Sequence, residues 1–161
     1  MTYFPDGKRT FVVACIYRGS RDGWSNVIFR ERVWGQGANL ILVKTKQGAI
    51  IGGFTTKSWG PWTQSWVVDD AAFIFNINQR FNQTNGRYSI DLNDNGFRFG
   101  SDMFSVSASQ LNHDNAGWNK HADTSRGYDI PKDSSGKCSL TGEEGDNFTA
   151  VELEVFKVVN Y

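Results

Sequence analysis

Hydrophobic residues recur mainly at every second position of this chain, which is the pattern of half-buried β-strands. In residues 151–159, for example, Val151, Leu153 and Val155 alternate with glutamates. Strand-like segments occupy residues 11–17, 40–46, 49–56, 72–78, 87–92, 97–107 and 151–159. Because no repeated strand–helix–strand order links them, antiparallel sheets packed face to face are favoured. The sequence predicts a mainly β fold, an antiparallel β-sandwich with one or two short helices.

One segment has a helical period instead. From Ser25 to Trp34, the apolar residues at 24, 27, 28 and 34 share one face of a helix. Ser25 is a suitable N-cap, and Gly35 and Gly37 end the predicted helix.

Glycines also mark the connection between two neighbouring predicted strands. Residues 40–46 and 49–56 are joined at Lys46-Gln-Gly48, where Gly48 supplies the positive φ of a tight hairpin. Gly52 and Gly53 lie inside the second of these strands. They indicate a β-bulge or a close approach of another group to the strand backbone.

Residues 108–147 have neither the two-residue period of a strand nor the period of a helix, and they are rich in Asn, Asp, Ser, Gly and Lys. A loop of this length is uncommon in a compact domain, and such loops are usually functional or mobile. The whole chain of 161 residues has the length of one domain. We therefore expect a single sandwich domain over residues 1–161, with a long polar loop over 108–147.

The charge balance limits the class of ligand. Seventeen Lys and Arg residues balance seventeen Asp and Glu residues, so no excess positive charge is available to bind nucleic acid. No apolar run approaches the ~20 residues of a membrane-spanning helix, and no export signal is visible at the start. Six Trp residues instead provide flat, rigid contact surface.

Several segments resemble the TLD (TLDc) domain family in the order of that family. They are Ile16-Tyr-Arg-Gly-Ser-Arg-Asp-Gly-Trp24, Leu40–Gly48 with Gly52-Gly-Phe54, Ala72–Phe75, Phe99-Gly100 with Asp102–Val106, and Phe148–Phe156. The resemblance implies a β-sandwich with small helices. It also implies a link to oxidative-stress resistance and to binding of the vacuolar proton pump. The family has no settled catalytic residues, so none is transferred to this chain.

The residues needed for catalysis are sparse. Both histidines, His113 and His121, fall in the polar segment without a nucleophile elbow or a triad spacing. We therefore predict a binding protein rather than an enzyme.

The segment from Asp91 to Asp102 has the spacing of a calcium loop. Asp91, Asn93 and Asn95 occupy positions one, three and five, a glycine is sixth, and Asp102 is twelfth. The alternative is a β-hairpin that turns at residues 93–96, which the sequence favours because no helices flank the segment. A turn rich in Asp and Asn still binds calcium in some proteins, so Ca²⁺ is the expected cofactor, with Asp114 as a further candidate ligand.

A second oxygen-rich cluster in the polar segment has the composition of a sugar site. Carboxylates and amides bind sugar hydroxyls, and an aromatic ring packs against the apolar sugar face. The candidate ligand-binding residues in this cluster are Asn112, His113, Asp114, Asn115, Trp118, His121 and Asp123. Trp59 and Trp62, in a predicted exposed loop, complete the set because exposed aromatic residues mark binding surfaces.

Two functions follow from these residues. The first is a calcium-dependent lectin of the galactose type, similar in general character to small lectins of marine invertebrates, extracellular and homodimeric, that binds a glycan or simple sugar. The alternative is a cytoplasmic TLD-type protein-interaction module that acts in oxidative-stress resistance or on the vacuolar proton pump. The polar and aromatic residues of the predicted loops favour the lectin.

Overall fold

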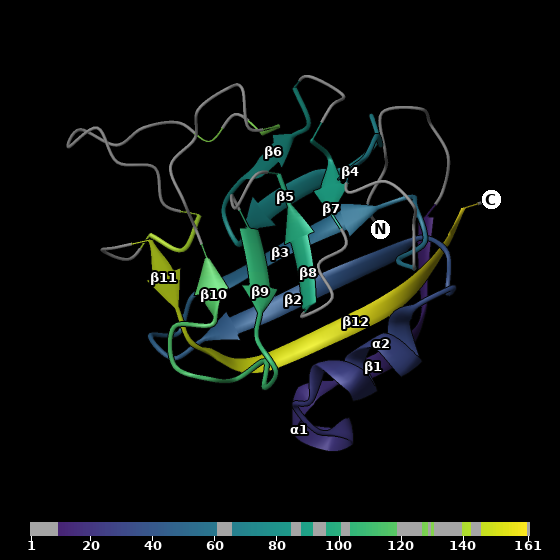
Figure 1. The fold of residues 1–161 in the computed structure, drawn as a ribbon. Helices are drawn as coiled ribbons and strands as arrows, with labels where there is room; N and C mark the ends of the chain where they lie inside the picture. Colours follow the sequence, from purple (N-terminus) through teal and green to yellow (C-terminus); the bar gives the residue numbers. More distant parts are fainter. Residues whose placement is uncertain are drawn as a thin grey trace.

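Two antiparallel sheets lie face to face, with two short helices beside one of them (Figure 1). The computed structural model describes residues 10–60, 66–84, 88–91, 96–100, 104–118, 127, 128, 130, 140–142 and 146–160. Within these residues each sheet has six strands. The predicted mainly β sandwich with short helices is confirmed.

The first sheet is built around the long C-terminal strand. Its strands, in spatial order, are β1 (Thr10–Arg18), β12 (Ala150–Asn160), β2 (Asn39–Thr45), β3 (Ile50–Thr55), β5 (Phe73–Asn76) and β6 (Arg80–Asn82). The turn between β2 and β3 falls at the predicted place, and Gly48 has a φ of 100° there. The β2–β3 hairpin therefore follows directly from its local sequence.

The second sheet consists of shorter strands and lies in front of the first in Figure 1. Its spatial order is β11 (Asn147–Phe148), β10 (Gly117–Trp118), β9 (Phe104–Ser107), β8 (Gly96–Phe99), β7 (Ile90–Asp91) and β4 (Trp66–Val67). The expectation of one strand over 97–107 is wrong, because β8 and β9 form an antiparallel hairpin in which Phe99 pairs with Phe104. The polar segment 108–147 is also not a continuous loop, since it contains β10 and the first residue of β11.

Two helices connect β1 to β2. Helix α2 (Asn26–Val33) begins after Ser25, whose hydroxyl accepts a hydrogen bond from the Val27 amide, so the predicted helix and its N-cap are confirmed. The four-residue helix α1 (Gly19–Asp22) precedes it and lies against β1 and β12.

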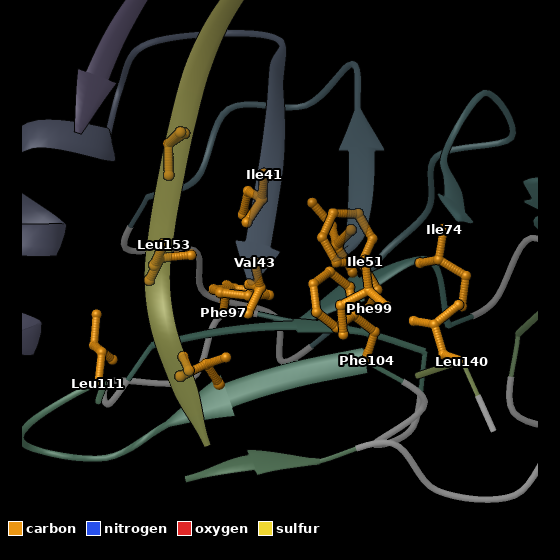
Figure 2. Close-up of a cluster of buried hydrophobic side chains, with 14 of the residues drawn as sticks. Ile41, Val43, Ile51, Ile74, Phe97, Phe99, Phe104, Leu111, Leu140 and Leu153 are labelled. Atoms are coloured by element: carbon orange, nitrogen blue, oxygen red, sulfur yellow. The ribbon is translucent and has the colours of Figure 1, made fainter. Parts of the chain in front are cut away.

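The core fills the space between the sheets (Figure 2). Aromatic rings dominate its centre: Phe99 and Phe104 stack with their centroids 5.8 Å apart, and Trp59 meets Phe99 edge to face at 5.6 Å. Ile41, Val43, Ile51 and Leu153 from the first sheet are fully buried against these rings. Each such side chain contributes about 1.5–3 kcal/mol by burial, which fixes how the two sheets face each other.

The glycine pair in β3 allows close contacts on both faces of the first sheet. A Cβ on Gly53 would lie 2.6 Å from the Phe99 ring, and a Cβ on Gly52 would lie 2.4 Å from the Phe75 ring and 2.6 Å from the carbonyl oxygen of Ile41. The predicted close approach to the backbone is confirmed, with one ring on each side of the strand.

Candidate functional site

The connection from β1 into α1 is fixed by a buried tyrosine. Tyr17 is fully buried, its hydroxyl donates a 2.8 Å hydrogen bond to the carbonyl oxygen of Gly23, and its ring meets Phe29 edge to face at 5.2 Å. Desolvation raises the pKa of the Tyr17 hydroxyl, and the negative charges of Asp22 and Glu152 add to this effect. The hydroxyl therefore stays protonated and acts as a structural donor.

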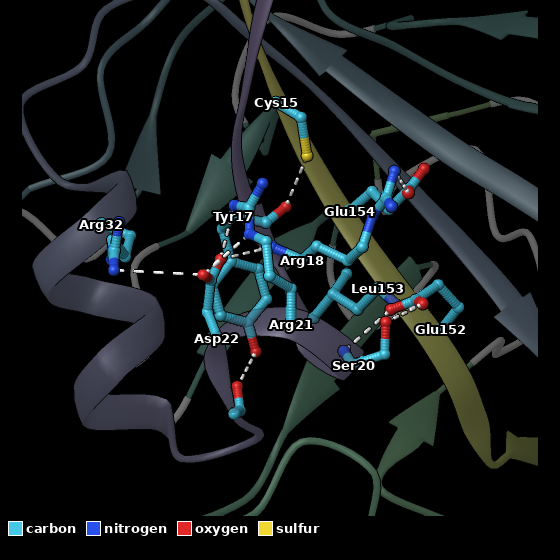
Figure 3. A network of polar contacts seen from close by, with 11 residues as sticks. Cys15, Tyr17, Arg18, Ser20, Arg21, Asp22, Arg32, Glu152, Leu153 and Glu154 are labelled. Atoms are coloured by element: carbon cyan, nitrogen blue, oxygen red, sulfur yellow. Dashed lines mark hydrogen bonds and ion pairs between the residues drawn. The ribbon is translucent and has the colours of Figure 1, made fainter.

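Asp22 organises the polar residues around α1 (Figure 3). Its carboxylate accepts hydrogen bonds from Nε of Arg21 at 2.9 Å, from a terminal guanidinium nitrogen of Arg21 at 2.7 Å, and from the backbone N–H of Arg18 at 2.9 Å. The Arg21 hydrogen bonds, followed by the Arg18 amide and nearby positive charge, lower the pKa of Asp22 from 3.8 to about 2. Asp22 is thus a fixed anion at the end of α1.

Three arginines at α1 expose part of their side chains. Arg18, Arg21 and Arg32 have side-chain exposures of 44%, 47% and 56%. Arg18 forms a 2.6 Å ion pair with Glu154, and Arg32 lies 4.0 Å from Asp22. We name Arg18, Arg21 and Arg32 the α1 arginine surface.

Ser20 attaches α1 to the first sheet. Its backbone N–H and its hydroxyl both donate to the Glu152 carboxylate on β12 (Figure 3). The helix that carries Arg21 is therefore tied to β12 by a side chain 132 residues away in the sequence.

A second polar feature crosses the outer face of the second sheet. Strand pairing aligns one residue from each of its six strands, and neighbours in such a row share a face. These residues are Trp66, Asp91, Arg98, Ser105, Trp118 and Asn147, and we name them the cross-strand row. The row faces away from the core, because the alternate residues Phe97 and Phe99 point into it.

The centre of the cross-strand row is more buried than its ends. Arg98 forms a 3.4 Å ion pair with Asp91, and their side chains are only 24% and 11% exposed. Ser105 is 1% exposed, and among the described residues its hydroxyl has no hydrogen-bond partner. Trp66 and Trp118 are half-buried on either side. The row therefore combines a neutral ion pair, a buried hydroxyl and two indoles.

A comparison with known protein families shows to which family the chain belongs. The sequence model of the TLDc domain matches residues 1–159 of the 161. This chain belongs to the TLDc domain family. No curated protein sequence matches it. In the part of this TLDc domain that the structure describes, no helix has the length and hydropathy needed to span a membrane.

The predicted sugar-site residues of this TLDc domain separate into two places. Asn112, His113, Asp114 and Asn115 are exposed on a turn before β10, whereas Trp118 lies on β10 itself and belongs to the cross-strand row. The expectation that Trp118 lies on a loop is wrong, because strands on both sides pair with it. His121 and Asp123 lie outside the described residues.

The exposed turn is held by backbone hydrogen bonds of its own and by contacts with Thr149. Asn115, with a φ of 59°, donates its backbone N–H to the Thr149 hydroxyl at 3.1 Å. Asp114 lies 3.9 Å from the Lys46 amine, and both side chains are largely exposed. These contacts account for the shape of the turn and leave its sugar-binding role a prediction.

Trp59 does not fit the predicted role of an exposed aromatic platform. It is fully buried, and its indole Nε1 donates a 2.7 Å hydrogen bond to Oδ1 of the buried Asn39. Assigning Trp59 to an exposed binding loop is wrong, because the ring fills the core beside Phe97 and Phe99. Trp62 lies outside the described residues.

The predicted calcium ligands are also distributed over different elements. Asp91 lies on β7 in the ion pair with Arg98, and residues 90–91 pair with 98–99 as the hairpin alternative requires. Asn93, Asn95 and Asp102 lie outside the described residues. Among the residues that are described, no group of three or more His, Cys, Asp or Glu side chains is placed to hold a metal ion. Calcium binding stays a prediction.

Four residues of the cross-strand row, among them Arg98 and Ser105 at its centre, are absent from the predicted site residues. Arg98 and Ser105 lie in strands whose alternate residues are phenylalanines and a valine, and this alternation assigns them to the outer face. It does not identify the residues of other strands that lie beside them, which depends on strand register.

Proposed function

We propose that this TLDc domain is a protein-interaction module and that the α1 arginine surface is the part of it that contacts the partner. The family match over residues 1–159 supports the module class. The observation that carries the location is the group of three partly exposed arginines at α1, in which Arg21 and Arg32 lie against Asp22 and Arg18 pairs with Glu154.

Arginines held in this way suit a protein interface. A free arginine loses side-chain entropy when it binds, whereas Arg21 and Arg18 are already oriented by ion pairs with Asp22 and Glu154. Arginine is also among the residues that contribute most to binding at protein interfaces. Each guanidinium group already has a carboxylate partner in the domain, so the matching partner surface is one that offers further hydrogen-bond acceptors to the exposed N–H groups.

The partner we propose is the vacuolar proton pump, with oxidative-stress resistance as the cellular role, as for the TLD domains that the sequence resembles. A cytoplasmic location is part of this proposal. The proposed module is a binding protein without catalytic activity. The lectin interpretation receives no support from the family match, and its galactose specificity, extracellular location and homodimer stay predictions.

Binding of the purified peripheral sector of a vacuolar proton pump to the immobilised domain tests this function. Arg32→Glu is the sharpest variant, because Arg32 is 56% exposed and only 4.0 Å from Asp22, so its loss should leave the fold intact. We expect Arg32→Glu to weaken binding at least tenfold. The same charge change at the exposed Lys57, which follows β3, should change affinity less than twofold.

Two results would oppose the proposal. Absence of binding by the wild-type domain would remove the proton pump as the partner. Equal loss of binding in Arg32→Glu and Lys57→Glu would remove the α1 arginine surface as the contact site, since a nonspecific charge effect would then explain the result.

A further inference from the structure

We propose that Ser20 is a phosphorylation site and that its phosphorylation detaches α1 from β12. Ser20 lies within the polar network of Figure 3, where it connects α1 to Glu152. This inference deepens the proposed function, because the detached helix carries part of the α1 arginine surface. Only its last step, the effect on partner binding, rests on that function.

The surroundings of Ser20 meet the requirements of a serine kinase. Among the serines that the structure describes, Ser20 and Ser109 are exposed, and the others are half-buried or buried. Arg18 and Arg21 lie two positions before and one position after Ser20, and their side chains are 44% and 47% exposed. Ser109 has no basic residue within three positions. A kinase that recognises basic residues through an acidic substrate groove therefore discriminates Ser20 from Ser109.

The short helix around Ser20 allows this segment to open. Helix α1 has four residues, and the Gly23 amide closes it by donating to the carbonyl oxygen of Gly19 at 3.0 Å. A helix this short is not stable on its own, so side-chain contacts such as that of Ser20 with Glu152 hold it in place. Local opening of such a segment costs less free energy than unfolding of the domain, and it presents Ser20 to the kinase.

Phosphorylation changes the Ser20 side chain from a hydrogen-bond donor into an anion. The kinase transfers the terminal phosphoryl group of ATP to Oγ of Ser20. A phosphorus–oxygen bond forms at Oγ, the bond to ADP breaks, and the hydroxyl proton passes to a carboxylate of the kinase. The product carries a charge of about −1.5 to −2 at pH 7, and its Oγ no longer donates.

The contact that this anion removes is the one that ties α1 to β12. Oγ of Ser20 donates to one oxygen of the Glu152 carboxylate at 2.5 Å, and the Ser20 amide donates to the other at 3.2 Å. A phosphate on Ser20 meets a carboxylate of the same sign at this place, so attraction turns into repulsion. Because both hydrogen bonds end on Glu152, the backbone of α1 loses its tie together with the side chain.

The arginines of α1 then offer hydrogen-bond donors to the phosphate. Guanidinium groups bind phosphate through two parallel hydrogen bonds, and the side chains of Arg18 and Arg21 are partly exposed. Each N–H group that turns to the phosphate is lost to the partner protein. Phosphorylation of Ser20 should therefore weaken binding through the α1 arginine surface.

Treatment of the folded domain with ATP and the catalytic domain of protein kinase C, which prefers basic residues on both sides of its target, tests the site. Mass spectrometry should locate a phosphoryl group on Ser20 and none on Ser109. Hydrogen–deuterium exchange then measures the release of α1. We expect peptides over residues 18–24 to exchange at least tenfold faster in the phosphorylated domain, with unchanged exchange in β2 and β3.

Two variants separate charge repulsion from the loss of a hydrogen bond. Ser20→Ala removes the hydroxyl without adding charge, and should speed exchange over residues 18–24 less than threefold. Glu152→Gln keeps the size of the side chain and removes the repelling charge, so its phosphorylated and unphosphorylated forms should differ less than threefold. Exchange in β2 and β3 reports whether each variant folds.

The proposal is overturned if Ser20 takes up no phosphoryl group, if phosphorylation leaves exchange over residues 18–24 unchanged, or if Glu152→Gln retains the tenfold effect. These outcomes do not involve the proton pump, so they decide the proposal even if the wild-type domain fails to bind it. If the domain binds the pump, phosphorylation should weaken that binding at least tenfold. Unchanged affinity would overturn the effect on the α1 arginine surface.

Discussion

The indole Nε1 of Trp59 donates a 2.7 Å hydrogen bond to Oδ1 of Asn39, and both residues are completely buried. Asn39 in turn donates through its side-chain nitrogen to the carbonyl oxygen of Gly37 at 3.0 Å. The loop after β3 is thereby joined to the segment that leads from α2 into β2. This tryptophan is a structural residue of the TLDc domain.

Replacing Trp59 should therefore affect stability rather than binding. Trp59→Phe leaves Oδ1 of Asn39 without its buried donor and opens a cavity, and we expect a loss of about 2–4 kcal/mol in the free energy of unfolding. Urea denaturation measures this loss. Trp66→Phe, at a half-buried position, is the control and should lose less than half as much. Equal losses at both positions would contradict the assigned role of Trp59.

The glycine pair in β3 should tolerate no side chain. Gly53→Ala pushes a methyl group into the Phe99 ring, and Gly52→Ala pushes one against Phe75 and the Ile41 carbonyl. We expect each variant to lose about 2 kcal/mol or more of unfolding free energy, because overpacking strains the core. Gly35→Ala has open space but a φ of 73°, and should lose about 1 kcal/mol. A melting temperature of Gly53→Ala at or above the wild-type value would contradict the close contact.

Asp69 should be essential for joining the β3 end to the β4–β5 connection. Its carboxylate, on a residue that is 3% exposed, accepts hydrogen bonds from the Thr55 hydroxyl at 2.6 Å, the Thr56 amide at 2.7 Å and the Thr56 hydroxyl at 2.8 Å. Asp69→Asn replaces an acceptor with a donor, and we expect a loss of about 2–4 kcal/mol in urea denaturation. Asp70→Asn, at the exposed neighbouring position, should change stability by less than about 0.5 kcal/mol.

Asp22 should make the stability of the domain depend on acid pH. Because its pKa is lowered in the folded state from 3.8 to about 2, its stabilising contribution is complete above pH 4 and is lost as the pH falls toward 2. The difference in unfolding free energy between the wild type and Asp22→Asn should therefore be about 1 kcal/mol larger at pH 5 than at pH 2.5. If this difference in unfolding free energy stays constant between pH 5 and pH 2.5, the Arg21 contact does not lower the pKa of Asp22.

Local periodicity was sufficient to predict much of this fold. Alternation identified β2, β3, β5 and β12 within a few residues, and the N-cap residue Ser25 identified the start of α2. Helix α1 was missed because four residues are too few for a helical period. The apolar residues Phe97, Phe99 and Phe104 favour one strand over the β8–β9 hairpin, whereas the turn-forming residues 100–102, Gly-Ser-Asp, are the signal that indicates the hairpin.

The candidate sites depend on contacts that the sequence pattern does not contain. Asp91, Arg98, Ser105 and Trp118 become neighbours only through the register of four strands, in which a shift of one residue would reverse every face. The position of Trp59 depends on tertiary packing, because a tryptophan between turn residues is equally compatible with a loop and with a core. Arg18, Arg21 and Asp22 were identified as part of the family motif, but their geometry requires α1 and β12.

The most direct test of the proposed function is a hydrogen–deuterium exchange measurement on the domain, free and bound to the peripheral sector of the vacuolar proton pump. We expect slower exchange in the bound domain over residues 18–33 and 150–156, which carry the α1 arginine surface and its β12 contacts, and unchanged exchange in β8 and β9. Slower exchange confined to β8, β9 and β10, with unchanged exchange over residues 18–33, would contradict the proposed function.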